Sequence, residues 1–170
     1  MKRNVFGNHK TKSNGPRPLQ RLQSIADQLR EDLNTSRVTI RVDSVALCLA
    51  LEAVAVESLA DGVKAIKSET TPDIRNGNAP KWLIANRRTF VMQDCLHPSH
   101  PELAPESYVI ETYAVRAEMV SPVLKNRELV GIISAHHTVG PRQWTPQEVS
   151  RIEAACKRVA DVLVASDETY

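Results

Sequence analysis

Two segments of the chain repeat their apolar residues at helical spacing, every three or four positions. The first runs from Leu19 to Leu33 and predicts a helix that ends at Asn34. The second begins where Thr145 offers a hydroxyl cap, Pro146 suits the first helical position, and the Glu148 carboxylate can reach back to the cap. Its apolar positions are Val149, Ile152, Cys156, Val159 and Leu163. Both segments are therefore expected to be helices with one buried side.

Between these helices, the chain contains runs typical of strands. Residues 47–56 predict a strand, although their alanines leave a helix possible. Residues 60–78 and 94–107 are interrupted by glycine or proline and predict loops, and a short helix is expected near Pro80. The predicted strands are residues 38–42, 47–56, 89–93, 115–124 and 129–137.

The last two strands form a predicted hairpin with one apolar and one polar face. Side chains alternate along a strand, and the odd-numbered residues of both strands are mostly apolar. We expect these rows to share the face beneath the C-terminal helix. This register requires an odd number of loop residues or a bulge near residues 125–128, because a two-residue turn alone pairs the rows the other way. The side chains then gathered on the opposite face are Arg116, Glu118, Ser134 and His136.

This order of elements predicts an α+β domain with a central antiparallel sheet of five or six strands. The terminal helices should cover one face, and the middle loops should fold over the other to leave a ligand pocket. We expect one domain at residues 19–166, a disordered basic tail at residues 1–18, and a short tail at residues 167–170.

Composition agrees with a single domain and narrows its setting. The 170 residues suffice to bury a core, and 22 Lys and Arg nearly balance 20 Asp and Glu. No apolar run approaches the roughly 18 residues of a membrane-spanning helix, and the first residues lack a secretory segment. The 3 cysteines are odd in number and widely separated, which suits reduced thiols in the cytoplasm.

The basic N-terminal tail also allows a nucleic-acid-binding arm. Its positive charges are sparse, and the rest of the chain has few aromatic residues on which bases could stack. We therefore expect neither a nucleic acid nor a membrane as partner.

The segment Asp94–His100 gathers reactive side chains within a short loop. Cys95, His97 and His100 are ligand types that zinc and iron prefer, and a thiol beside an imidazole can act as a nucleophile. A structural zinc site needs a second ligand pair, which is missing unless His136 contributes across the pocket. The simpler interpretation is that Asp94 caps the loop by accepting hydrogen bonds from nearby amides.

The segments VRAEMVSPV and LVGIISAHHTVGPRQWTPQEV, preceded by RRTFVMQD, resemble the strands and closing helix of cyanobacteriochrome and phytochrome GAF domains. The resemblance extends over residues 19–166 and is specific over residues 115–159. It implies that His136, the first histidine of the AlaHisHis sequence, faces the ligand. Those photoreceptors attach a bilin through a cysteine shortly before the VRA segment, where this chain has Pro105–Tyr108. A covalent bilin is therefore not expected.

Together these patterns predict a stand-alone GAF-domain sensory or regulatory protein that binds a small polar metabolite without a covalent bond. The resemblance further implies a homodimer through the terminal helices and a separate output protein. The alternative is a small GAF-fold enzyme that uses Cys95, or a bound metal, with His97, His100 or His136. The expected ligand-binding residues are His136, Arg116, Glu118, Ser134, Asp94, Tyr108 and Tyr113.

Overall fold

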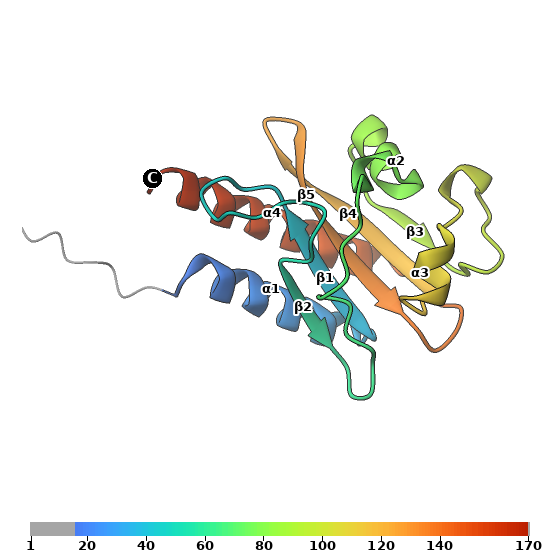
Figure 1. The fold of residues 1–170 in the computed structure, drawn as a ribbon. Helices are drawn as coiled ribbons and strands as arrows, with labels where there is room; N and C mark the ends of the chain where they lie inside the picture. Colours follow the sequence, from blue (N-terminus) through green and yellow to red (C-terminus); the bar gives the residue numbers. More distant parts are fainter. Residues whose placement is uncertain (1–15, 170) are drawn as a thin grey trace, which may run out of the picture.

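The two longest helices, α1 (Pro18–Leu33) and α4 (Pro146–Asp167), confirm the two apolar repeats of the sequence (Figure 1). The structure is a computed structural model, and it describes residues 16–169. Helix α1 stops at Asn34, whose left-handed backbone directs its amide back to the last turn. The predicted cap of α4 is present, because Thr145 and Glu148 each accept a hydrogen bond from the other's backbone amide.

The sheet has five strands, all antiparallel to their neighbours, in the order β2-β1-β5-β4-β3. The N-terminal strand β1 therefore lies between the short edge strand β2 and the C-terminal hairpin. The strands are β1 (Arg37–Val42), β2 (Val56–Leu59), β3 (Phe90–Met92), β4 (Ala117–Lys125) and β5 (Glu128–His137).

The strand predicted at residues 47–56 is wrong, because these residues form turns and β2 begins only at Val56. A hydrogen bond of 2.7 Å from the Leu51 amide to the Asp43 carboxylate closes these turns. Cys48 has a φ of 54°, which lies outside the range of a strand.

The segments between β2 and β4 that were expected to fold over the second face of the sheet include two short helices and two 3-10 turns. Helix α2 (Asn78–Asn86) confirms the helix expected near Pro80, and α3 (Ser107–Glu111) lies where the sequence pattern predicted none. The 3-10 turns are η1 (Ile74–Asn76) and η2 (Pro101–Leu103).

The hairpin of β4 and β5 has the bulged register that the sequence predicted. Glu118 lies directly opposite His136, on the polar side of both strands. The turn at residues 126–127 has only two residues, both with positive φ, and a bulge between Val123 and Leu124 shifts the pairing. The bulge thus reconciles a two-residue turn with apolar rows that share one face.

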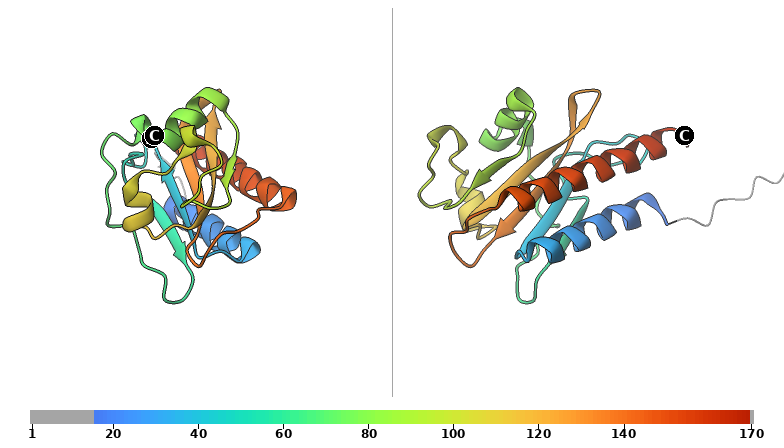
Figure 2. Two further views of the ribbon diagram at one scale, coloured as in Figure 1. Left: turned by 90° about the vertical axis from the view of Figure 1, so that its right-hand side faces the viewer. Right: turned by 180° about the vertical axis from the view of Figure 1, so that it is seen from behind.

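Helices α1 and α4 pack against each other on one face of the sheet, and α2 and α3 lie on the other side (Figure 2). The two long helices run antiparallel, so the start of α1 and the end of α4 lie at the same end of the molecule. Two apolar cores result, one under the long helices and one under the loops. Since both faces of the sheet are covered, all 6 residues of β1 are buried.

The predicted basic tail lies mostly outside the described residues, which begin with exposed Pro16 and Arg17. At the other end, α4 continues to Asp167, one position past the expected domain boundary. Within residues 16–169, none of the helices combines the length and the apolarity that crossing a bilayer requires.

Candidate ligand-binding site

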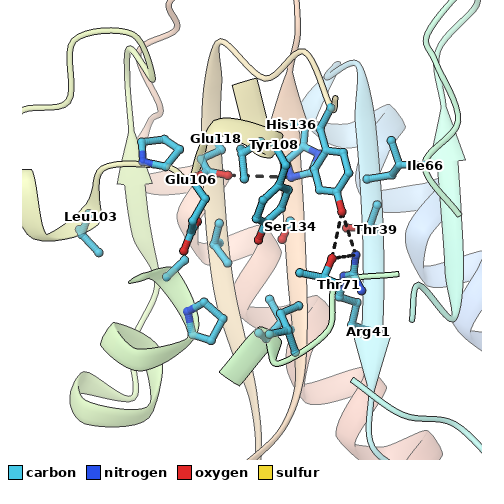
Figure 3. Close-up of a pocket in the computed structure, with 18 of the residues that line it drawn as sticks. Thr39, Arg41, Ile66, Thr71, Leu103, Glu106, Tyr108, Glu118, Ser134 and His136 are labelled. Carbon is cyan, nitrogen blue, oxygen red and sulfur yellow. Dashed lines mark hydrogen bonds and ion pairs between the residues drawn. The ribbon is translucent and has the colours of Figure 1, made fainter. Parts of the chain in front are cut away.

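A cavity of about 70 Å³ lies between the second face of the sheet and the segments that cover it (Figure 3). Strands β1, β4 and β5 form its floor. Residues 103–106, 108, 109 and 113 and the start of α2 contribute walls and roof. A single water molecule requires roughly 10–15 Å³ of such space. The cavity therefore has room for about five water molecules, or for a ligand of similar size.

Strand pairing arranges the floor in three successive rungs. The first rung joins Arg37, His136 and Glu118 across β1, β5 and β4. The middle rung joins Thr39, Ser134 and Val120, and the third contains Arg41 and Ile132. Polar groups therefore stand at both ends of the floor.

At the first rung, Arg37 holds His136 in one protonation state. The guanidinium of Arg37 donates to His136 Nδ1 at 3.1 Å and to the Tyr113 carbonyl at 3.0 Å. Because a guanidinium can only donate, Nδ1 is the acceptor and the proton of the neutral ring is on Nε2. Burial, together with the charges of Arg37 and Arg41, lowers the pKa of His136 to about 3. His136 is therefore a neutral N–H donor at physiological pH.

Glu118 presents a buried carboxyl group to the cavity. Its nearest charged or ring nitrogen is His136 Nε2 at 3.9 Å, which is too far for a direct hydrogen bond. Burial raises the pKa of Glu118 to about 7, and the Glu106 carboxylate adds to the rise. Within residues 16–169, no side chain or amide donates a hydrogen bond to this carboxyl, which leaves its acceptors for a ligand or water.

At the other end of the floor, Arg41 and Thr71 (Figure 3) form a connected polar cluster with Tyr113. The hydroxyls of Thr71 and Tyr113 are 3.0 Å apart, and Arg41 lies 3.3 Å from the first and 3.5 Å from the second. Arg41 also donates to the Glu52 carbonyl at 2.7 Å. Its side chain has no carboxylate partner in the described part of the chain, and burial lowers its pKa.

Two tyrosines and Glu106 build the roof. The Tyr113 ring stacks on the His136 ring at a centroid distance of 6.3 Å, and Tyr108 meets Tyr113 edge-on at 5.3 Å. Burial raises the pKa of Tyr108 to about 12, so its hydroxyl stays protonated. Glu106 is held in place because its Oε1 accepts a 2.7 Å hydrogen bond from the Asn78 amide at the start of α2.

Five of the seven ligand-binding residues expected from the sequence line the cavity, whereas Arg116 and Asp94 do not. Strand β4 begins only at Ala117, so strand alternation does not control the direction of Arg116. The Asp94 carboxylate serves its own loop, where it accepts from the Leu96 amide at 3.0 Å and contacts His97. The five that line it are Glu118, Ser134, His136, Tyr108 and Tyr113.

The alternative site around Cys95 is not assembled. Cys95 is buried, and burial raises the pKa of its thiol far above the usual range, which opposes formation of a nucleophilic thiolate. The side chains of His97 and His100 are 82% and 62% exposed and contact carboxylates of their own loop. In the part of the chain that the structure describes, no three His, Cys, Asp or Glu residues gather as a metal site requires.

The sequence pattern missed several polar residues of the cavity. Thr39 and Arg41 belong to the polar row of the strand predicted at residues 38–42, and alternation alone cannot distinguish a cavity-facing row from a solvent-facing one. Thr71 and Glu106 lie in predicted loops, where no periodicity exists to indicate direction. The missed residues are Thr39, Arg41, Thr71 and Glu106 in the lining, and Arg37 behind His136.

The sequence model of the GAF domain matches residues 17–163 of this chain. No curated protein sequence matches it. Among solved structures, the GAF domain of cyanobacteriochrome TePixJ is 21% identical, with a TM-score of 0.72, and the match covers 95% of this chain and 99% of that chain.

Two further solved structures show the same likeness at lower identity. A phycocyanobilin-bound GAF domain from a cyanobacterial phytochrome is 15% identical, with a TM-score of 0.72 over 91% of this chain and 88% of that chain. The chromophore-binding domain of the bacteriophytochrome RpBphP3 from R. palustris is 12% identical, with a TM-score of 0.71, and the match covers 91% of this chain and 58% of that chain. At these identities the likeness concerns the fold.

Proposed function

Because the chain belongs to the GAF domain family, as the resemblance predicted, we propose that it is a sensory or regulatory domain that binds a small polar metabolite without a covalent bond. The observation that carries this proposal is the cavity on the second face of the sheet. Its lining includes the Glu118 carboxyl, which lacks a hydrogen-bond donor among the described residues, and the Nε2–H of His136. A fold does not select a ligand, but such unpaired polar groups do.

The lining of the cavity supports non-covalent binding. None of the cavity-lining residues described by the structure is a cysteine, and Pro105 and Tyr108 line the cavity where the resemblance places the bilin-attaching segment. Drug-sized ligands occupy pockets of roughly 300–1,000 Å³, well above the about 70 Å³ present here. A tetrapyrrole would require the roof to move away, whereas a small metabolite fits beneath it.

A contact at His136 can be transmitted to the end of α1 through the backbone. The His136 carbonyl accepts hydrogen bonds from the Thr35 hydroxyl at 2.9 Å and from the Ser36 amide at 3.2 Å. Thr35 and Ser36 follow Asn34, the residue at which α1 stops. A ligand that shifts His136 therefore acts on the end of α1, and we propose that this helix carries the signal to a separate output protein.

The terminal helices are also the proposed homodimer contact. Leu19 near the start of α1 and Val164 near the end of α4 are apolar, yet 46% and 39% exposed. Leu19 is the second residue of α1 and Val164 lies in the last turn of α4, and these two helix ends lie at the same end of the molecule (Figure 2). Light scattering should give the mass of two chains, and Leu19→Lys with Val164→Glu should lower it to one. If the wild type itself has the mass of one chain, this dimer is excluded.

A thermal-shift screen of cellular metabolites tests the proposed function. At least one polar compound should raise the melting temperature of the wild type, and His136→Ala should abolish the shift. His97→Ala is the matched control, because His97 is exposed outside the cavity and the shift should survive its loss. Circular dichroism confirms that both variants are folded. A screen without any binder, or a shift that persists in folded His136→Ala, would contradict the proposal.

A further inference from the structure

We infer that the ligand is a small zwitterion, with an ammonium group bound at Glu118 and Glu106 and a carboxylate bound at Arg41, Thr71 and Tyr113. This inference rests on the proposed function and specifies its ligand. The two groups of residues stand at opposite ends of one cavity (Figure 3), and each end lacks the charge that such a ligand would bring.

The acidic end calls for a cation that carries hydrogen-bond donors. Glu118 is 6% exposed, and His136 stands too far away to donate to its carboxyl. The Glu106 carboxylate lines the same cavity and is close enough to disfavour ionisation of Glu118. An ammonium group supplies three donors and a positive charge, so it would satisfy both carboxyls at once.

The basic end calls for an anion. Arg41 is 6% exposed and is bound by carbonyls and hydroxyls, with no carboxylate partner among the described residues. A buried cation without a counter-charge is costly. The hydroxyls of Thr71 and Tyr113 stand beside it and can rotate their protons toward a carboxylate. Charge-assisted hydrogen bonds of this kind are the strong ones.

The rungs of the floor set the spacing of the two ends. Arg41 pairs with Ile132, two rungs from the His136 and Glu118 pair, so the two ends are roughly 13 Å apart along the strand direction at the usual strand rise. Across the sheet, the backbones of Arg41 and Glu118 are separated by a further two strand spacings, because β5 lies between β1 and β4. Side chains reach inward from both ends. The middle rung contributes Val120, whose apolar side chain suits a short methylene chain, between Thr39 and Ser134 of the lining.

Cavity size limits the ligand to a short aminocarboxylate. The volume of about 70 Å³ accommodates roughly five or six non-hydrogen atoms at the space that each water needs. Alanine, β-alanine and γ-aminobutyrate fall in or near this range. A carboxylate alone would leave Glu118 unsatisfied, and an amine alone would leave Arg41 without a counter-charge.

Isothermal titration of the full chain with a matched set of probes tests the inference. The set contains the aminocarboxylates from glycine to ε-aminocaproate, together with butyrate and butylamine, which each carry one charge only. We expect one aminocarboxylate to bind at least tenfold more tightly than either singly charged probe. Equal binding of butyrate or butylamine, or no binding of any aminocarboxylate, would overturn the inference.

Two variants then assign the ends. Glu118→Gln should bring the affinity of the best aminocarboxylate to within about threefold of that of the carboxylate of equal length, because it removes the partner of the ammonium group. Arg41→Gln should weaken binding at least tenfold, and Tyr113→Phe serves as the second variant if Arg41→Gln fails to fold. Glu102→Gln is the control, since Glu102 is exposed outside the cavity. If Glu118→Gln still binds the aminocarboxylate more tightly than the carboxylate of equal length by as much as the wild type does, Glu118 does not bind the ammonium group.

The outcomes separate this inference from the proposed function. Suppose that a neutral metabolite raises the melting temperature, that His136→Ala abolishes this rise, and that no aminocarboxylate binds. The inferred zwitterionic ligand is then wrong, whereas the proposed sensory function is supported. If no compound of the wider screen binds, both fail.

Discussion

Arg37 donates a hydrogen bond to Nδ1 of His136 across 3.1 Å, although 99 positions of sequence separate the two residues. They meet because they are direct partners in the neighbouring strands β1 and β5. The contact places the imidazole proton on Nε2 and keeps the ring in register with Glu118. The donor that the ring offers to a ligand thus depends on a residue of another strand.

Replacement of Arg37 should therefore change the tautomer of His136. In Arg37→Met the Nδ1 acceptor loses its donor, and a fraction of the ring should carry its proton on Nδ1. Long-range ¹⁵N–¹H correlation spectra measure this fraction directly. The variant should also lose about 1–3 kcal/mol of stability, because the buried carbonyl of Tyr113 and the partly buried carbonyl of Lys64 lose their donor. Arg21→Met is the control, since Arg21 is exposed on α1, and a His136 spectrum unchanged in Arg37→Met would contradict the assignment.

Glu118 should make the stability of the domain depend on pH. Its pKa in the folded protein, about 7, lies above the ordinary value of 4.5, so the folded state binds the proton more tightly than the unfolded state. The resulting stabilisation is complete below pH 4.5 and is lost as the pH rises through 7. From pH 5 to pH 8, the unfolding free energy of the wild type should fall relative to Glu118→Gln, by about 3 kcal/mol at most. Urea denaturation of both proteins measures this difference in unfolding free energy. If the free energies of the two proteins run parallel from pH 5 to pH 8, the pKa of Glu118 is not raised.

The two tyrosines of the roof should respond differently to loss of their hydroxyls. Tyr113→Phe removes the partner of Thr71 at 3.0 Å and of Arg41 at 3.5 Å, and should cost about 1–2 kcal/mol. Tyr108→Phe is the matched control, because its hydroxyl makes no hydrogen bond within the described residues; it should change stability by less than about 0.5 kcal/mol. Thermal or urea unfolding compares the two. Equal losses would show that the Thr71 cluster does not stabilise the fold.

Thiol accessibility should distinguish the three cysteines. Cys48 is exposed, whereas Cys95 and Cys156 are buried. Burial raises the pKa of Cys156 to about 12 and that of Cys95 further. Ellman's reagent should therefore modify one thiol quickly in the native protein and the other two only on unfolding, and Cys48→Ser should remove the fast phase. A fast reaction that persists in Cys48→Ser and disappears in Cys95→Ser would revive the nucleophile at Cys95.

Local patterns were sufficient to predict the two long helices, α2, the hairpin and part of the site. The cap at Thr145 and the apolar repeat of α4 act within a few residues, so tertiary contacts did not override them. The register of β4 and β5 followed from polarity, because a one-residue slip would have turned either Glu118 or His136 to the face under the helices. The failed prediction at residues 47–56 had no comparable pattern, since its alanines suit several conformations.

The sequence by itself thus determined the GAF fold, the long helices, and the face of the hairpin that carries Glu118 and His136. Only the tertiary structure decided that β1 lies beside β5, and this pairing brought Arg37 to His136 and Arg41 to the far end of the cavity. It also left Arg116 and Asp94 outside the lining of the cavity. The physical reason is that periodicity reports which side of a strand a residue faces. Whether that side meets solvent, a loop or a cavity depends on segments distant in sequence.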